Sequence, residues 1–132
     1  MLSITQQVLK QIIDHAQSDL PNEACGYLAG KNGVVTHSFP LTNIDHSPEH
    51  FSFDPAEQFK TVKEARALGL EILANYHSHP SSPARPSEED IRLAYDPGIS
   101  YVIVSLAKEF PEIKTYVKAN GTLQIEDLRI LD

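Results

Sequence analysis

The chain has 132 residues, and its 11 lysine and arginine residues against 18 aspartate and glutamate residues give a net charge of −7 with histidine neutral. That length suits one domain covering residues 1–132, and the lone Cys25 excludes an internal disulfide framework. An acidic chain without lysine or arginine clusters disfavours nucleic acid as a partner. No apolar run approaches the roughly 20 residues of a membrane span, and Met1–Thr5 lacks a signal-peptide pattern, so we expect a cytoplasmic protein without membrane contact.

A helix and a β-hairpin are predicted in the first third of the chain. Thr5 can cap a helix over residues 5–18, in which four apolar residues recur at helical spacing. These residues are Leu9, Ile12, Ile13 and Ala16. Next, the apolar or β-branched runs Cys25–Gly30 and Val34–Leu41 flank an Asn-Gly pair, which tolerates positive φ and therefore predicts a hairpin.

A second helix is predicted to begin after Asp54. Asp54 serves as its N-cap, Pro55 occupies its first turn, and Glu57 is expected to reach back to the cap. Gly69 is a natural cap for the C-terminal end of this helix. Three residues are expected to form one of its faces: Phe59, Val62 and Ala65.

The second half of the chain alternates strands with one short helix. Leu70–His77 predicts a strand, a short helix begins at Ser87, and the apolar run Tyr101–Leu106 predicts a central strand buried on both faces. Ile113–Ala119 and Thr122–Ile130 flank a second Asn-Gly pair and predict a second hairpin. Helices mixed with hairpins indicate an α+β domain or a mixed-sheet α/β domain.

The residues with the clearest chemistry are His77 and His79, at the end of a predicted strand and before a proline-rich loop. Residues i and i+2 of a strand point to the same face, so both imidazoles can converge on one point. Asp90, about one turn into the short helix, can reach the same point when the loop folds back. Two imidazoles and a carboxylate are suitable zinc ligands, and a fourth position left to water is typical of catalytic zinc sites.

Simpler interpretations exist for each of these residues. A His-x-His pair on a strand is often only exposed or hydrogen-bonded, and Ser87-x-x-Asp90 is also a helix-capping motif. Capping accounts for Ser87 and Asp90 completely, but it does not account for two histidines that face the same way at the end of a strand. Cys25 lies in an apolar strand, where a buried and inert thiol is the better interpretation.

The order His77-x-His79, seven residues, Ser87, two residues and Asp90 resembles the signature of the JAMM metalloproteases, the catalytic MPN domains. That family also has a glutamate upstream, near the first hairpin, and Glu23 matches it in place and context. The resemblance covers nearly the whole chain and implies a short, bacterial-type member. The fold it implies is a mixed α/β, cytidine-deaminase-like fold, with a curved mixed β-sheet, hairpins and about three flanking helices.

The resemblance also implies a role for each of these five residues. His77, His79 and Asp90 would hold Zn²⁺. Glu23 would take a proton from the attacking water and pass it to the leaving amine. Ser87 would donate its hydroxyl hydrogen to the oxyanion. The implied activity is that of a zinc-dependent metallopeptidase or isopeptidase.

The substrates of this family are often ubiquitin-like proteins with Gly-Gly tails, and small bacterial members are similar to enzymes that process sulfur-carrier proteins. We therefore expect a ubiquitin-like or sulfur-carrier protein as the partner, by analogy within the family. The polar segment Asp45–His50 is expected to border the cleft, because the family's substrate-contacting insertion falls near it.

Two other functions stay open at this point. Catalytically inactive MPN domains act as assembly scaffolds, although those domains have lost metal ligands and all three are present here. Two histidines and a carboxylate also form the facial triad of non-haem iron oxygenases, which are all-β barrels unlike a chain with three helix patterns. Metal content separates the scaffold from the enzyme, and metal identity separates the peptidase from the oxygenase.

Overall fold

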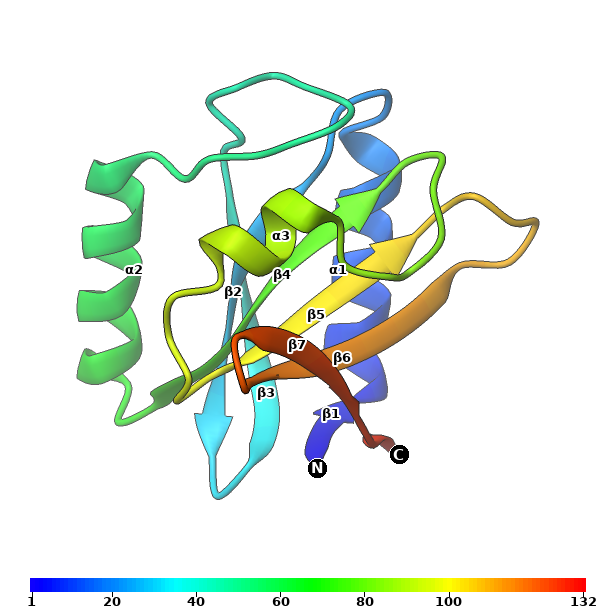
Figure 1. Ribbon diagram of the computed structural model, residues 1–132. Helices are drawn as coiled ribbons and strands as arrows, with labels where there is room; N and C mark the ends of the chain where they lie inside the picture. The colour runs from blue at the N-terminus through cyan, green and yellow to red at the C-terminus, as the bar shows by residue number, and fades with distance from the viewer.

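The computed structural model describes residues 1–132 and contains eight strands and three helices (Figure 1). In chain order these elements are β1 (Leu2–Thr5), α1 (Gln6–Ser18), β2 (Cys25–Lys31), β3 (Val34–Leu41), α2 (Pro55–Ala67), β4 (Glu71–His79), α3 (Glu88–Leu93), β5 (Ser100–Ser105), β6 (Glu112–Ala119), β7 (Thr122–Glu126) and β8 (Leu128–Leu131). None of the helices is both long and apolar enough to cross a membrane. The fold is therefore mixed α/β with three helices, as predicted.

All eight strands belong to one mixed sheet, in the order β7-β6-β5-β4-β2-β3-β1-β8. The two outermost strands, β7 and β8, are consecutive in the chain and are separated only by Asp127. Because so short a connection joins the two ends of the sheet, the sheet must curve until its ends approach each other. Leu2 in β1 donates its N–H to the carbonyl oxygen of Asp127 at 3.0 Å. The result is a nearly closed sheet that leaves little exposed strand edge.

The two faces of the sheet carry different structures. α1 packs on one face, and α3 lies across the opposite face (Figure 1). The α1 side holds the main hydrophobic core, to which the helix contributes Val8, Ile12 and Ala16. Strand β4 takes part in both layers, because Tyr76 joins this core whereas Asn75 and His77 line a groove beside α3.

Most of the predicted elements are confirmed, and their local signals act as expected. Thr5 caps α1 by accepting a hydrogen bond from the N–H of Val8 at 3.3 Å. The turn between β2 and β3 places Asn32 and Gly33 at φ 55° and 75°, and the turn between β6 and β7 repeats this pattern. All six residues of β5 are buried, as expected for a central strand.

The strands β1 and β8 correct the predicted element order. The sequence predicts one hairpin strand over Thr122–Ile130, but the chain leaves the hairpin after Glu126, and β8 pairs in parallel with β1, with Leu2 opposite Leu128. Each of these strands is only four residues long, so neither has enough alternating positions to predict a strand. Their pairing depends on the closure of the sheet, which is a long-range feature.

The start of α2 also differs from the prediction. Asp54 caps the helix by accepting the N–H of Ala56 at 2.9 Å, but Glu57 does not reach back to the cap. The Glu57 carboxylate instead accepts hydrogen bonds from the N–H and the hydroxyl of Thr42, at 2.7 and 2.9 Å. This glutamate therefore joins α2 to the chain that follows β3, a contact that the capping pattern does not predict.

The buried face of α2 is shifted from the predicted one. Thr61 and Ala65 are its buried residues, and Val62 is half-buried. Phe59 is 67% exposed, and the ammonium group of Lys63 lies 5.4 Å from the centre of its ring. α2 covers the flank of the sheet (Figure 1), where it buries two small side chains instead of an aromatic one.

Candidate active site and metal centre

The structure brings His77, His79 and Asp90 together, and we call them the His-His-Asp cluster. Both histidines lie at the end of β4 and are 4% exposed, and Asp90 lies in the first turn of α3. The Nε2 atoms of the two histidines are 3.1 Å apart, and they lie 3.2 and 3.1 Å from Oδ2 of Asp90. The three side chains converge as the strand spacing predicts, and they can hold a metal ion.

Hydrogen bonding around His79 makes the cluster suited to a cation. Nδ1 of His79 lies 2.8 Å from the carbonyl oxygen of Pro83, which can only accept, so Nδ1 carries the proton. In the neutral ring the Nε2 lone pair then faces Asp90 and His77, an arrangement that needs a positive charge between the three atoms. Ligand atoms about 2.0–2.1 Å from a tetrahedral zinc would be roughly 3.3 Å apart, which is close to the spacing in the cluster.

The protonation of the cluster follows from burial and from its hydrogen bonds. Burial alone would raise the pKa of Asp90, but hydrogen bonds from His77 and His79 outweigh it and hold that pKa well below its usual range. Burial is the largest single influence on the pKa of His79 and lowers it, but the hydrogen bonds with Asp90 and Pro83 and the negative charges of Asp90 and Glu23 together outweigh it and move the pKa above 6.5. The cluster thus keeps an ionised carboxylate, and protons compete with any metal for His79.

Ser87 caps α3, as its spacing to Asp90 predicts. Its Oγ accepts the N–H of Asp90 at 3.0 Å, and its own N–H donates to Oδ2 of Asp90 at 2.9 Å, which completes a capping box. The same Oδ2 faces both histidines, so the cap also orients the carboxylate. The hydroxyl hydrogen of Ser87 is not used by the cap, and the oxyanion role implied by the family resemblance stays a prediction.

Glu23 lies in the loop before β2, and strand pairing brings it to the cluster. β2 and β4 pair antiparallel with Cys25 opposite His77, and Ser78 bonds to Ala24 one residue further on. Extending this register by one more residue brings Glu23 opposite His79, whose charge acts on the Glu23 carboxyl group. The residue is 3% exposed, and its Oε1 has no hydrogen-bond partner. Burial raises the pKa of this carboxyl group from 4.5 to about 8, against the opposing charge of His79. A group that titrates near neutral pH can both accept and return a proton.

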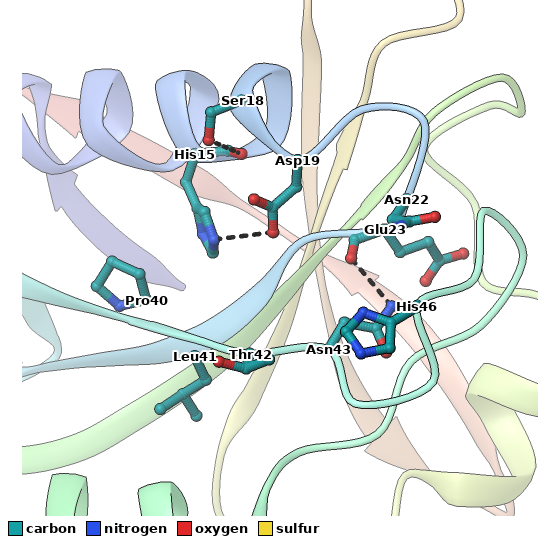
Figure 2. A pocket seen from close by; sticks show the side chains of 10 residues that line it. All are labelled: His15, Ser18, Asp19, Asn22, Glu23, Pro40, Leu41, Thr42, Asn43 and His46. Atoms are coloured by element: carbon teal, nitrogen blue, oxygen red, sulfur yellow. Dashed lines mark hydrogen bonds and ion pairs between the residues drawn. The ribbon is translucent and has the colours of Figure 1, made fainter.

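Two further residues hold Glu23 in place, and sequence reasoning missed both. Ser78 is fully buried, accepts the N–H of Ala24 on its Oγ at 2.7 Å, and donates its own N–H to the carbonyl oxygen of Ala24 at 3.0 Å. Asn43 donates its side-chain amide to the carbonyl oxygen of Glu23 at 3.1 Å (Figure 2). Strand alternation predicts that Ser78 faces away from the histidines, but no sequence signal identifies its partner on the next strand.

The segment between β3 and α2 lies against the site. Within the predicted border Asp45–His50, the carbonyl oxygen of Ser47 accepts the N–H of Glu23 at 2.8 Å. Directly after this segment, the ring of Phe51 stacks on the imidazole of His77, with ring centres 4.7 Å apart and planes inclined by 25°. The stacked ring limits the rotation of this imidazole, so the segment contacts both the general-base candidate and a ligand candidate.

Two cavities lie near these residues, and they differ in character. A groove of about 400 Å³ is lined by His77, Asp90 and several aromatic side chains. A polar pocket of about 490 Å³ lies between the end of α1 and the end of β3 (Figure 2). Figure 2 shows the carboxylate of Glu23 pointing away from His15 and Asp19, which line that pocket. The groove, and not the polar pocket, contains residues of the His-His-Asp cluster.

The single cysteine takes no part in this arrangement. Cys25 is fully buried in β2, and its Sγ lies 3.9 Å from the carbonyl oxygen of Leu41. Burial raises the pKa of the thiol to about 12, so the sulfur stays protonated and is a poor nucleophile at neutral pH. The interpretation of Cys25 as a buried, inert thiol is confirmed.

Comparison with known families covers most of the chain. The family model described as prokaryotic homologs of the JAB domain matches residues 5–117. That span includes Glu23, Ser87 and the whole His-His-Asp cluster. The chain belongs to this family. The resemblance to the JAMM proteins, drawn above from five residues, is thereby confirmed.

Two curated relatives of the chain carry the names of enzymes. The chain is 31% identical over 135 residues to a CysO-cysteine peptidase of Mycobacterium tuberculosis, an alignment that covers 100% of this chain and 92% of the relative. It is 33% identical over 111 residues to a desampylase of Haloferax volcanii, with 79% of this chain and 80% of the relative covered. The named relatives are thus peptidases or isopeptidases.

Solved structures share the fold of this JAB-family chain. A protein from Desulfitobacterium hafniense matches with a TM-score of 0.92 at 44% identity, covering 100% of this chain and 94% of its own. A JAB1/MPN domain protein from Archaeoglobus fulgidus matches with a TM-score of 0.69 at 25% identity, covering 98% and 97%. The predicted curved mixed sheet with three flanking helices is confirmed as the fold of JAB1/MPN domains.

Proposed function

We propose that this JAB-family protein is a zinc-dependent metallopeptidase that hydrolyses the amide or isopeptide bond at the glycine tail of a ubiquitin-like or sulfur-carrier protein. The observation that carries the proposal is the His-His-Asp cluster, whose three candidate ligand atoms lie 3.1–3.2 Å apart beside the buried Glu23. The names of the relatives, a CysO-cysteine peptidase and a desampylase, support this kind of bond and partner.

The metal would be held by Nε2 of His77, Nε2 of His79 and Oδ2 of Asp90. The hydrogen bond from Nδ1 of His79 to Pro83 fixes one imidazole, and the ring of Phe51 stacks on the other, so both ligands are oriented in advance. Zinc, when bound, lowers the pKa of water to about 7 and polarises a carbonyl group.

Glu23 would serve as the general base and then as the general acid. Its buried carboxyl group has a pKa of about 8, so it can take a proton from the attacking water and return it to the leaving amine near neutral pH. Ser78 and Asn43 hold the backbone on either side of this carboxyl group by bonding to Ala24 and to Glu23 itself. Glu23 would therefore act beside His79 and would not be a metal ligand.

Ser87 would stabilise the oxyanion that forms as the scissile carbonyl becomes tetrahedral. Its oxygen is occupied as the acceptor of the N–H of Asp90, whereas its hydroxyl hydrogen is free to donate. A donor aimed at developing negative charge contributes most where water is excluded. The cap and the oxyanion contact use different atoms of the hydroxyl group, so one serine can fill both roles.

The test is hydrolysis of synthetic peptides that end in Gly-Gly joined to an amine, with peptides ending in Leu-Leu as matched substrates. We expect the zinc-loaded protein to prefer the Gly-Gly peptide, because a chain without side chains passes a narrow site most easily. Elemental analysis of the purified protein should find about one zinc per chain, the count for a single three-ligand site. A His77→Ala/His79→Ala double variant should lose both the zinc and the activity.

Other outcomes separate the alternatives. Iron in place of zinc, together with oxygen consumption, would indicate a non-haem iron oxygenase. A metal-free protein that binds a partner without cleaving it would indicate an inactive scaffold. Equal turnover of the Gly-Gly and Leu-Leu peptides would contradict the glycine-tail substrate alone, and an unchanged zinc content in the double variant would refute the metal site.

A further inference from the structure

The groove beside the His-His-Asp cluster has a floor made by one face of three neighbouring strands. Tyr27 of β2 lies opposite Asn75 of β4, and Asn75 lies opposite Tyr101 of β5. His77 follows two residues further along the same face of β4, and all four residues line the groove. The groove therefore runs along β4 from Asn75 to the cluster.

Two members of this row leave a buried polar atom unpaired: Nδ1 of His77, which belongs to the His-His-Asp cluster, and Oδ1 of Asn75, which does not. The hydroxyl of Tyr27 accepts a hydrogen bond from Nε2 of Gln58 at 2.9 Å. The hydroxyl of Tyr101 donates to the carbonyl oxygen of Asp96 at 2.8 Å and accepts its N–H at 3.0 Å. Oδ1 of Asn75 is buried and has no hydrogen-bond partner. Such atoms are uncommon in folded proteins, and an N–H group that entered the groove would satisfy this one.

The order of groups along β4 indicates which part of a substrate lies at this position. Asn75, His77 and His79 follow one another at every second residue, and Glu23 lies opposite His79, at the end away from Asn75. Since Glu23 delivers the proton to the leaving amine in the proposed reaction, that amine lies toward His79 and the acyl segment lies toward Asn75. Two residues of a strand span about 6.8 Å, and two residues of an extended peptide span the same distance.

We propose that Asn75 is a specificity-determining residue, whose side-chain oxygen accepts the backbone N–H of an extended acyl segment about two residues before the bond that is cut. This inference rests on the proposed function and names a substrate contact of that same site. Backbone N–H groups of an extended tail are accessible to such an acceptor, whereas a proline at that position has none to donate. Asn75 therefore selects an extended tail by its backbone and not by its side chains.

The test replaces single atoms in the substrate and in Asn75, using the zinc-loaded protein. Gly-Gly peptides joined to an amine are made with one upstream backbone N–H at a time replaced by an ester oxygen. In the unaltered protein, the ester about two residues before the cleaved bond should lower kcat/KM by about tenfold, the effect of one lost hydrogen bond. The Asn75→Leu variant should cleave the parent peptide with a similarly lowered kcat/KM. Replacing that N–H by the ester should not lower the kcat/KM of this variant any further. Asn75→Asp, which keeps an acceptor oxygen, should keep the sensitivity to the ester.

A control variant and a second readout make the result independent of folding and of hydrolysis. Gln124→Leu, a matched polar-to-apolar change at an exposed position of β7, should leave kcat/KM unchanged. The second readout is an NMR titration with the free tail peptide, which is not joined to an amine and so lacks the bond that the enzyme would cut. This peptide should shift the side-chain amide signals of Asn75, and its ester analogue should not. If neither peptide is cleaved but this difference is found, the proposed function fails and the Asn75 contact stands. An equal ester effect in the unaltered protein and Asn75→Leu, equal shifts with both peptides, or no shift at all would overturn the assignment.

Discussion

Glu23 combines burial with the need to ionise, so stability and chemistry are linked at this residue. Its carboxyl group is buried and its Oε1 is unpaired, so the neutral form is favoured and its pKa rises from 4.5 to about 8. Between these two values the folded protein holds a proton that the unfolded chain has released. The contribution of this group to the free energy of unfolding is therefore fully present below the pKa that it has in the unfolded chain. It is lost as pH rises through the pKa that it has in the folded protein, because the buried carboxyl group must then ionise.

The substitution Glu23→Gln tests both consequences. An amide cannot take a proton, so kcat should fall by about 10²–10⁴ while the zinc content stays the same. In the metal-free protein the change removes a buried ionisable group, so the free energy of unfolding should rise by about 1–3 kcal/mol at high pH and change little at low pH. Urea unfolding at about pH 8 and about pH 4 measures this difference. Near-normal activity would mean that another group is the base, and loss of zinc would mean that Glu23 is a ligand.

The protonation of His79 should make the metal affinity of the site depend on pH. Burial lowers its pKa, but the hydrogen bonds with Asp90 and Pro83 and the nearby negative charges together raise that pKa above 6.5. The ring must lose a proton before Nε2 can bind a metal. As pH falls below the raised pKa, zinc affinity should fall by about tenfold per pH unit for each proton displaced. Competition with a chelator from about pH 8 to about pH 5 measures this slope, and an affinity that stays constant over that range would contradict it.

At the scale of the elements, the start of α3 serves both the helix and the site. α3 has six residues, too few for a helix to be stable alone, so its position comes from its cap and its surroundings. Ser87 and Asp90 exchange the two hydrogen bonds of the capping box. Two hydrogen bonds hold the loop before them to the sheet. The carbonyl oxygen of Ser82 accepts one from a hydroxyl group of β5 at 2.7 Å, and that of Ala84 accepts one from a hydroxyl group of β6 at 2.6 Å. The cap and this loop together place Asp90 against the histidines.

Substitutions of Ser87 separate capping from oxyanion stabilisation. Ser87→Ala should lower the free energy of unfolding by about 1 kcal/mol through loss of the cap, and kcat by about 10²–10³ through loss of the donor. Ser87→Gly should cost only roughly a few tenths of a kcal/mol in stability but should lose as much kcat, because glycine caps without a hydroxyl group. Thermal or urea unfolding and steady-state kinetics measure the two effects. An unchanged kcat in both variants would leave capping as the only role of this serine.

At the scale of the whole molecule, closure of the sheet depends on two short strands that carry none of the site residues. Leu2 and Ile4 of β1 are 4% and 0% exposed and belong to the core beneath α1. β8 completes the sheet beside them, with Ile130 opposite Ile4. β1 leads directly into α1, so its pairing sets where that helix lies on the sheet. The site stands on β4, which β2 and β3 separate from β1.

A matched pair of substitutions tests how the two sides of this closure contribute. Ile4→Ala should lower the free energy of unfolding by about 2–5 kcal/mol, because it opens a cavity in the core. Ile130→Ala is the control from the partner strand. It should lower the free energy of unfolding by less, because Ile130 is 48% exposed. Urea unfolding measures both, and zinc content per folded chain should stay unchanged in both variants. Equal losses would show that strand pairing, and not core burial, dominates at this edge.

Signals between near neighbours in the sequence determined much of the fold and part of the candidate site. The caps at Thr5 and Ser87 use partners three residues away, and both Asn-Gly turns form at the predicted positions. The convergence of His77 and His79 requires only the alternation of a strand. These features depend on contacts within a few residues, so a single sequence contains the information that predicts them. Glu23 was identified by the family resemblance and by no spacing rule.

Only the tertiary structure decided which distant residues meet. The register of β2 against β4 puts Glu23 opposite His79, and the path of the chain between β3 and α2 stacks Phe51 on His77. The parallel pairing of β1 with β8 follows in the same way from the curvature of the sheet. A shift of one residue in any of these registers would turn every side chain of a strand to the other face, and no local pattern excludes such a shift. The candidate ligands on β4 are therefore a local property of the sequence, whereas their general base is placed by long-range strand pairing, because the packed core selects the register.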